Sequence, residues 1–221
     1  MAVGAHKFRV PQRAAWLVEP PLPCHRLYSV KISTSVTLVP VEQASEPARS
    51  TLLAGISALE LAPDQEGFVG EPWPMAEKAL DDPRRHLFAI IVPGPVLKVV
   101  GMGILHVGAA TDTSWPDDDS AVLLRGFLID RRAQGLGYGT EATMAAVELA
   151  HSLVAELQLP ALGVVLSVDE RNVAGQHAYR KAGFMDRGRH LGGRSGPRRI
   201  LYSPFPQPVT STFIDVPDRV N

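Results

Sequence analysis

One stretch of the chain constrains its fold more than any other: an apolar strand pattern that leads through a glycine-rich turn into a helix pattern. It reads Phe127-Leu-Ile-Asp-Arg-Arg-Ala-Gln-Gly-Leu-Gly-Tyr-Gly-Thr-Glu-Ala142, with glycines at 135, 137 and 139. Glycine allows turn conformations and close approach of the main chain to a ligand. The first N–H groups of a helix lack partners within the helix and carry partial positive charge. We therefore expect a strand–turn–helix unit whose turn suits a phosphate or pyrophosphate.

The rest of the chain mixes strand and helix patterns around this unit. Apolar, β-rich runs predict strands over 36–41, 87–92, 97–107, 121–129, 162–168, 184–190 and 198–202. Helical spacing predicts helices over 43–60, 74–80, 137–157 and 173–182. Pro93-Gly-Pro joins two strands as a hairpin, Pro160 stops the long helix, and Asn172 and Gly183 bound the last one. This mixture predicts an α/β sheet domain.

Composition narrows the class of protein. The 221 residues carry 22 Lys+Arg and 23 Asp+Glu, so bulk charge gives no support for a nucleic-acid or membrane-surface protein. The single cysteine, Cys24, rules out an intrachain disulfide and a cysteine-based zinc site. Residues 1–11 carry no apolar segment typical of a secretory signal, and the apolar stretch 87–97 is broken by prolines and too short for a bilayer span. We expect a soluble cytoplasmic protein.

The glycine turn alone leaves several ligands to weigh. A P-loop needs Lys-Ser/Thr after the last glycine, but Tyr138 and Thr140 stand there. A dinucleotide fingerprint needs a third glycine where this chain has Thr140. Such a fingerprint also follows the first strand of a parallel sheet, whereas this turn follows at least three predicted strands. A pyrophosphate cradle, Arg132-x-x-Gly135-x-Gly137, and a turn without a ligand both remain open.

A second motif decides between them. It reads Asn172-Val-Ala-Gly-Gln-His-Ala-Tyr-Arg-Lys-Ala-Gly-Phe184. With the glycine turn and the Thr140-Glu-Ala run it resembles the GCN5-related N-acetyltransferase (GNAT) superfamily. Gly126-Phe-Leu before the turn is most similar to the ribosomal-protein-alanine-acetyltransferase (RimJ/RimL-like) branch. The close resemblance covers 121–184, and a looser one extends back to residue 36.

The resemblance implies a fold and a domain plan. The implied fold is a central mixed, mostly antiparallel twisted sheet of six to seven strands, flanked by helices, with a V-shaped opening between the fourth and fifth strands. The acetyltransferase domain would span 34–205, with an N-terminal extension over 1–33 packed on it and a C-terminal tail over 206–221.

The resemblance also implies acetyl-CoA as cosubstrate and no metal. The main chain of 134–139 and the Thr140 hydroxyl would hold the pyrophosphate, and main-chain groups of Leu128 and Ile129 would bind the pantetheine arm, as an added strand does. A free N–H near Leu128 would stabilise the oxyanion. The residues implied to bind the cosubstrate are Leu128, Ile129, Gln134, Gly135, Leu136, Gly137, Tyr138, Gly139, Thr140, Asn172 and Tyr179.

The implied reaction is acetyl transfer to a primary amine by direct attack in a ternary complex. Tyr179 matches the family's general acid to the CoA thiolate, although a tyrosine there also serves as packing. Asn172 matches a CoA contact and is equally a helix N-cap. His177 is expected to point away from Tyr179. A non-catalytic acyl-CoA-binding or sensor module of the same fold is the alternative.

The sequence leaves the base and the acceptor open. Relatives of this branch carry a strand carboxylate where the match puts Leu124, so Asp119, Glu71, Ser167 with a water, or a water relay to bulk are the candidates. The lack of a clear base favours an α-amine, whose pKa of about 7.7–8.0 lies below that of lysine. The acceptor is a small-molecule amine or a protein N-terminal or lysine amine, with no nucleic-acid or membrane partner, and the protein a monomer or homodimer.

Two charged clusters have open roles. The arginines at 187, 189, 194, 198 and 199 form either a solvated face or a contact to the CoA 3′-phosphate or an acidic acceptor. The run Asp117–Asp119 is either a solvated loop or an attraction for a polycationic acceptor.

Overall fold

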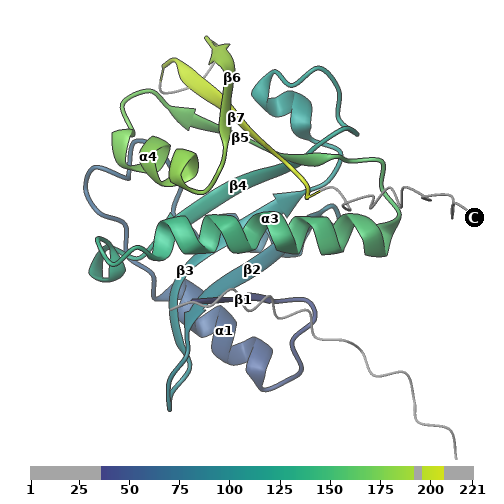
Figure 1. The fold of residues 1–221 in the computed structure, drawn as a ribbon. Coiled ribbons are helices and arrows are strands. Elements are labelled where there is room, and N and C mark those ends of the chain that lie inside the picture. The colour runs from purple at the N-terminus through teal and green to yellow at the C-terminus, as the bar shows by residue number, and fades with distance from the viewer. Residues whose placement is uncertain (1–35, 192–195, 207–221) are drawn as a thin grey trace, which may run out of the picture.

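A computed structural model describes residues 36–191 and 196–206 of the chain (Figure 1). The expected N-terminal extension over 1–33, with Cys24, lies outside the described residues, as does the tail beyond Pro206. None of the helices in the described part is both long enough and apolar enough to cross a bilayer.

The described chain folds around one seven-stranded sheet with strand order β1-β2-β3-β4-β5-β7-β6. Every neighbouring pair is antiparallel except β4 and β5, which are parallel. This mostly antiparallel mixed sheet confirms the expected fold class. The strands are β1 (Thr37–Pro40), β2 (Arg85–Val92), β3 (Lys98–His106), β4 (Val122–Ile129), β5 (Gly163–Asp169), β6 (Met185–His190) and β7 (Arg198–Pro204). The helices are α1 (Ala48–Ser57), α2 (Pro72–Leu80), α3 (Tyr138–Leu157) and α4 (Val173–Lys181).

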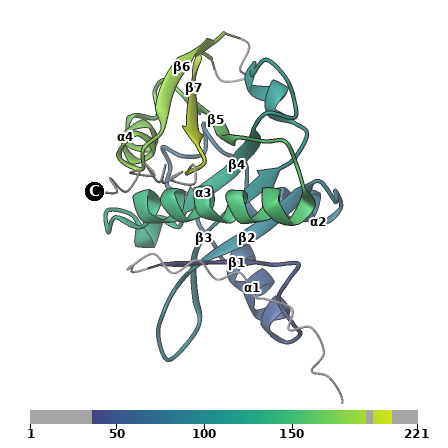
Figure 2. The ribbon, with the colours of Figure 1, turned by 45° about the vertical axis from the view of Figure 1, so that its right-hand side comes forward.

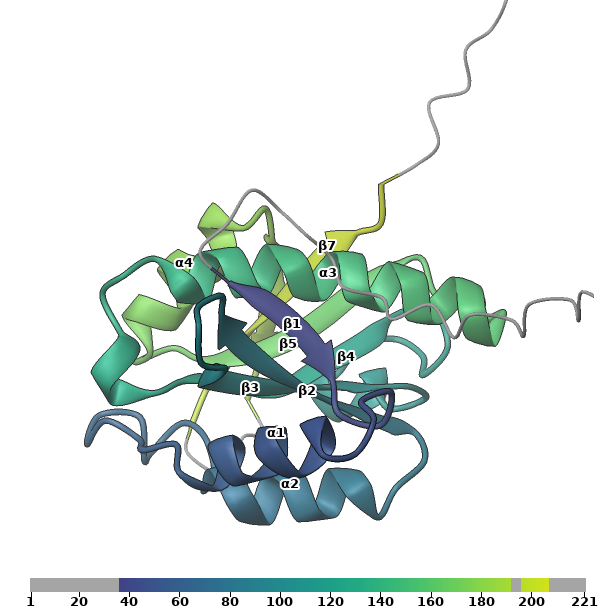
Figure 3. The same ribbon diagram turned by 90° about the horizontal axis from the view of Figure 1, so that it is seen from below.

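Helices cover both faces of the sheet, as the view from below shows (Figure 3). On one face α3 packs Ala146 and its apolar neighbours against Phe88 and Leu166 of the sheet. On the other face α1 and α2 pack against a second core, in which Leu52 and Leu128 are fully buried. The three-layer arrangement explains why the strand patterns are apolar on both faces.

Helix boundaries differ from the sequence expectation where backbone chemistry intervenes. The helix expected over 43–60 spans only Ala48–Ser57, because Pro47 occupies its N-cap position and a proline is tolerated only near a helix start. Glu60, expected to be helical, instead uses its main chain to hold the segment after β4: its N–H donates to the Asp130 carboxylate and its C=O accepts from Arg131. Helix α3 ends before Pro160 is reached, at the left-handed residue Gln158.

The sheet opens between β4 and β5, as expected. Only Val122↔Val164 and Leu123↔Val165 are paired, and the strands then diverge. A register shift in the β3–β4 ladder accompanies the divergence, at the point where Gly126 adopts a φ of 56°. The turned view separates β1–β4 from β5, β6 and β7, with α3 lying across the sheet (Figure 2).

Candidate active site

The glycine turn after β4 presents a run of unpaired N–H groups. Gly135 and Gly137 adopt left-handed φ values of 77° and 86°, and α3 begins directly after Gly137. Within the described part of the chain the main-chain N–H groups from 134 to 139 have no protein acceptor, whereas that of Thr140 donates to the Gly137 carbonyl at 3.1 Å. A Cβ at Gly135 or Gly137 would meet no protein atom within 4 Å, so the turn is open. Such an array of N–H groups at a helix start is suited to an anion.

A buried carboxylate fixes the turn from behind. Asp130, 3% exposed, accepts from the Arg132 main chain at 2.8 Å, from the Arg132 guanidinium at 2.7 and 2.8 Å, and from the Glu60 N–H at 3.1 Å. These bonds, the Arg132 side chain foremost, lower the pKa of Asp130 to about 2. The same Nη2 atom also donates to the Ala58 carbonyl at 2.9 Å, and Nη1 lies 3.3 Å from the Glu60 carboxylate. These contacts of Arg132 hold the turn in place.

Main-chain direction in β4 distinguishes its two predicted pantetheine contacts. The Asp130 N–H donates to Val100 on β3, and Leu128 lies opposite Met102 in the same ladder. Because main-chain groups alternate in direction along a strand after the register shift at Gly126, Leu128 uses its N–H and C=O toward β3, while the Phe127 carbonyl and the Ile129 main chain turn toward the opening. The Ile129 carbonyl there accepts from the Gln134 side chain at 3.1 Å. The open edge of β4 is thus formed by the neighbours of Leu128.

The opening between β4 and β5 contains a cavity of about 90 Å³. Its walls come from β4, β5, the α1–α2 loop, α4 and the first residue of β7. The lining residues are Gln65, Phe68, Val69, Leu124, Arg125, Gly126, Phe127, Leu166, Ser167, Val168, Asp169, Asn172, Tyr179 and Arg198.

Tyr179 reaches this cavity from α4. Its ring lies 6.1 Å from those of Phe127 and Phe184, both tilted at 57°. Among the described residues its hydroxyl has no hydrogen-bond partner, and burial raises the pKa of the Tyr179 phenol to about 12. The phenol is therefore protonated at neutral pH and free to donate into the cavity.

The other candidates fall into two groups. Asn172 lines the cavity, and its Oδ1 caps α4 by accepting from the Gly175 N–H at 2.8 Å. Of the base candidates, only Ser167 lines the cavity, while Asp119 and Glu71 are exposed outside it. His177 is exposed on α4 and does not line the cavity either.

The cavity has two chemically different faces. Leu124, Leu166 and Val168 face the core under α3, and Phe127 and Tyr179 pack against that core. The alternate side chains Arg125 and Ser167 therefore face the opposite side of the sheet, on which α1 and α2 lie. Arg198 joins Ser167 there, with Nη1 at 3.5 Å from the Ser167 hydroxyl.

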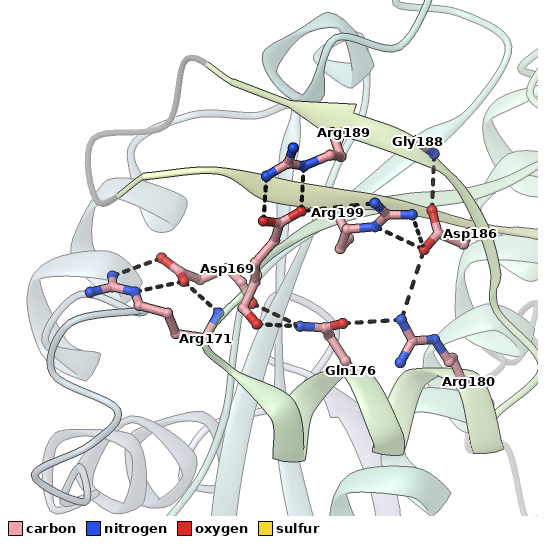
Figure 4. A network of polar contacts seen from close by, with 9 residues as sticks. Asp169, Arg171, Gln176, Arg180, Asp186, Gly188, Arg189 and Arg199 are labelled. Carbon is pink, nitrogen blue, oxygen red and sulfur yellow. Dashed lines mark hydrogen bonds and ion pairs between the residues drawn. The ribbon is translucent and has the colours of Figure 1, made fainter.

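The C-terminal arginines do not form one basic cluster. Arg189 makes two bonds of 2.6 and 2.7 Å to Glu170, and Arg199 binds Asp186 at 2.6 and 2.9 Å (Figure 4). Arg187 lies 5.5 Å over the Tyr202 ring. These three are used in surface contacts, and Arg194 lies outside the described residues.

The sequence analysis did not predict that His106 and Asp112 hold the Arg125 side chain. Its Nη1 lies 2.8 Å from Asp112 and 3.2 Å from Nδ1 of the buried His106 at the end of β3. Burial and the neighbouring arginines lower the pKa of His106 to about 4, so its neutral ring accepts from Arg125. Strand alternation places both residues on one face, but the pairing of β3 with β4 was needed to bring them together.

The site thus combines a mixed sheet that opens between two parallel strands with a glycine turn of free N–H groups. Residues 61–185 match the family model described as acetyltransferase (GNAT) domain. The chain therefore belongs to the GNAT family and is an N-acetyltransferase with acetyl-CoA as its cosubstrate.

Individual relatives agree with this assignment. An uncharacterized N-acetyltransferase, YbbJ of Bacillus subtilis (strain 168), is 28% identical over 153 residues, covering 68% of this chain and 89% of the relative. The aminoglycoside acetyltransferase AAC(6′)-Ib in complex with coenzyme A shares the fold with a TM-score of 0.56 and 18% identity, over 77% of this chain and 95% of that one. The spermidine N-acetyltransferase from Vibrio cholerae in complex with CoA and spermine has a TM-score of 0.52 and 15% identity over the same shares.

Proposed function

We propose that this protein transfers the acetyl group of acetyl-CoA to a primary amine by direct attack in a ternary complex, with Tyr179 as proton donor to the departing thiolate. The observation that carries the proposal is the unpartnered, protonated phenol of Tyr179 at the opening between β4 and β5. Tyr179 is also the residue of the second sequence motif that matches the family's general acid, which supports the same role.

The cosubstrate would lie along the open edge of β4. The N–H groups of 134–139 and the Thr140 hydroxyl would bind its pyrophosphate, and the Phe127 carbonyl and the Ile129 N–H its pantetheine arm. The main-chain groups of Leu128 would bond to β3 and so fix the position of this edge, and they would not contact the cosubstrate. The amide nitrogen of Asn172 would contact the arm from α4.

In the proposed reaction the amine nitrogen forms a bond to the thioester carbonyl carbon and the carbon–sulfur bond breaks. One proton leaves the amine and one reaches the sulfur. Because the pKa of the Tyr179 phenol, about 12, lies above that of a thiol, about 8.5 by analogy with cysteine, Tyr179 would donate its proton to the leaving sulfur and recover one that the amine nitrogen has released to solvent, so that overall one proton moves from nitrogen to sulfur.

No side-chain carboxylate is offered as the base in this proposal. Asp169 lines the cavity, but Arg171 binds both of its oxygens at 2.9 and 3.0 Å and lowers its pKa, which makes it a poor base. Deprotonation would pass through water near Ser167 to bulk solvent. This favours an acceptor whose amine is partly neutral at physiological pH.

The proposal includes a branch and a domain plan. We place the chain in the ribosomal-protein-alanine-acetyltransferase-like branch on the motifs around Gly126 and Gly139. We place the domain at 34–205 with an extension over 1–33 and a tail over 206–221. The acceptor is a small-molecule amine or a protein amine, and the protein is a cytoplasmic monomer or homodimer.

The test combines binding with turnover. Isothermal titration with acetyl-CoA should show binding in the micromolar range, and release of free CoA thiol should depend on an amine. Amino acids, peptide N-termini, polyamines and aminoglycosides form the panel. Absence of binding at millimolar acetyl-CoA would overturn the proposal. Binding without turnover on any amine would identify the non-catalytic sensor module instead.

A further inference from the structure

The cavity between β4 and β5 contains a cationic side chain whose partners are incomplete. The Nε of Arg198 is buried without a hydrogen-bond partner, and its only side-chain contact within the described residues is the long 3.5 Å one to Ser167. No described carboxylate forms an ion pair with Arg198; Asp169 feels its charge at longer range but is itself bound by Arg171. Arg198 is half-buried, and its buried Nε would gain a partner if an anion entered the cavity.

Arg198 differs from the arginines near it because side chains alternate between the two faces of the sheet at the start of β7. Arg199, the next residue, faces the opposite side of the sheet and binds Asp186, while Arg189 binds Glu170 (Figure 4). The sequence gives these three arginines the same character. Of the three, Arg198 lines the cavity and has a buried Nε without a hydrogen-bond partner.

The cavity carries a second positive charge on the same face. Arg125 lines it from β4 and is held from behind by His106 and Asp112. Since the glycine turn leads into α3 on the other face, acetyl-CoA bound at the turn would lie on the α3 side and leave the face of Arg125 and Arg198 to the acceptor. A polyamine or aminoglycoside would bring like charges against both guanidinium groups.

The acidic run at 117–119 gives a polycation no substitute site. Asp117 accepts from the Ser120 main chain and hydroxyl, at 2.6 and 2.9 Å, and Asp118 accepts from Thr111. These carboxylates fold their own loop and do not line the cavity. The carboxylates of Asp117 and Asp118 therefore serve as hydrogen-bond acceptors within the loop, outside the cavity.

We propose that Arg198, with Arg125 beside it, binds a carboxylate of the acceptor, so that the preferred substrates are primary amines that carry a carboxylate group. This rests on the proposed function. A planar guanidinium matches a carboxylate with two parallel hydrogen bonds, and such charge-assisted bonds are stronger than neutral ones. The carboxylate belongs either to a free amino acid or to an acidic residue beside a peptide amine.

Two sets of acceptors test the proposal and distinguish these sources. Free amino acids are compared with their carboxamides, and peptides beginning with glutamate with those beginning with glutamine, each at equal concentrations of neutral amine. In at least one set the carboxylate member should show a kcat/KM at least tenfold higher than its amide. Spermidine should be a poorer acceptor than either carboxylate.

Variants locate the effect. Arg198→Gln should reduce the carboxylate-to-amide ratio to about one, with an unchanged dissociation constant for acetyl-CoA, and Arg198→Lys should keep part of the ratio. Arg189→Gln, which removes a surface partner of Glu170, is the matched control and should keep the whole ratio. Calorimetric binding of the N-acetylated carboxylate to the CoA-loaded protein should weaken at least tenfold in Arg198→Gln. Thermal unfolding checks that the variants fold.

The outcomes separate this inference from the function on which it rests. Equal rates for carboxylates and amides, faster acetylation of spermidine, or an unchanged ratio in Arg198→Gln would overturn the inference while leaving the acetyltransferase intact. No turnover with any amine, despite acetyl-CoA binding, would overturn the proposed function and the inference with it.

Discussion

The two ends of the cleft are built from different parts of the polypeptide. At the turn, the proposed recognition uses main-chain N–H groups, whose directions follow from the positive φ values of Gly135 and Gly137. At the proposed acceptor face it uses side chains, with Arg125 coming from β4 and Arg198 from β7. The turn is therefore a local property of one segment, whereas the acceptor face exists only after distant strands have paired. Variants should affect the two ends in different ways.

The largest expected effect is on stability at the acceptor end. His106 has a pKa lowered to about 4, below an unfolded value of about 6.5. The folded protein binds this proton less tightly than the unfolded chain, so stability present above pH 6.5 is lost as the pH falls toward 4. The loss from this residue is about 3 kcal/mol. Urea unfolding at pH 7, 5.5 and 4 measures it.

The turn end should titrate in a separate window. Asp130 has a pKa lowered to about 2, so its contribution is present above pH 3.8 and is lost between there and 2. His106→Gln should flatten the pH dependence between 6.5 and 4 and leave the lower window unchanged. If His106→Gln kept the full decrease in the upper window, the assignment to His106 would be wrong.

The second effect concerns chemistry at the junction of the two ends. Tyr179→Phe removes the phenolic hydroxyl but keeps the ring between Phe127 and Phe184. Turnover should fall about a hundredfold, because positioned proton donors contribute at least that much. The dissociation constant of acetyl-CoA should change less than twofold. Steady-state kinetics and calorimetry measure the two quantities.

A tyrosine on the opposite face provides the control. Tyr202 stacks on Trp115 with centroids 4.8 Å apart and does not line the cavity. Tyr202→Phe should retain turnover within about twofold, since it removes no group near the reacting atoms. Equal losses in both variants would mean that the phenol at 179 acts only in packing.

The third effect tests main-chain recognition at the turn. Gly137→Val places a β-branched residue at a φ of 86°, which such residues rarely adopt, and its side chain would also obstruct the ligand. Acetyl-CoA should bind at least tenfold more weakly, as measured by calorimetry. Leu136→Ala truncates a 61% exposed side chain between the two glycines and should change the affinity less than twofold. A larger effect for Leu136→Ala than for Gly137→Val would show that side chains, not N–H groups, dominate this end.

The same contrast determines how much the sequence could predict. The hairpin 85–106, the unit from β4 to α3 and the cap at Asn172 were predicted, because each depends on neighbours in sequence. The sequence analysis placed the start of α1 at residue 43, which is too early. The helix begins at Ala48, directly after Pro47 at the N-cap position. The direction of the Leu128 main chain was not predictable, because it is set by the pairing with Met102 on another strand.

The arginines show this limit most clearly. Residues 198 and 199 are adjacent and chemically identical, yet β7 directs one into the cavity and the other to Asp186. Grouping them as one basic cluster was wrong because a strand alternates its side chains between faces. The role of Arg198 becomes visible only when β5 and β7 are known to be paired.

The short pairing of β4 with β5 has a consequence for the free protein. Two residue pairs connect β1–β4 to the other three strands, so the inner edges of β4 and β5 are exposed in the middle of a sheet that otherwise protects its amides. Their amide hydrogens should exchange as rapidly as those of an outer strand. Saturation with acetyl-CoA should slow this exchange at Ile129 while leaving Leu128, β2 and β3 unaffected, so the ligand would complete the part of the sheet that the polypeptide leaves unpaired.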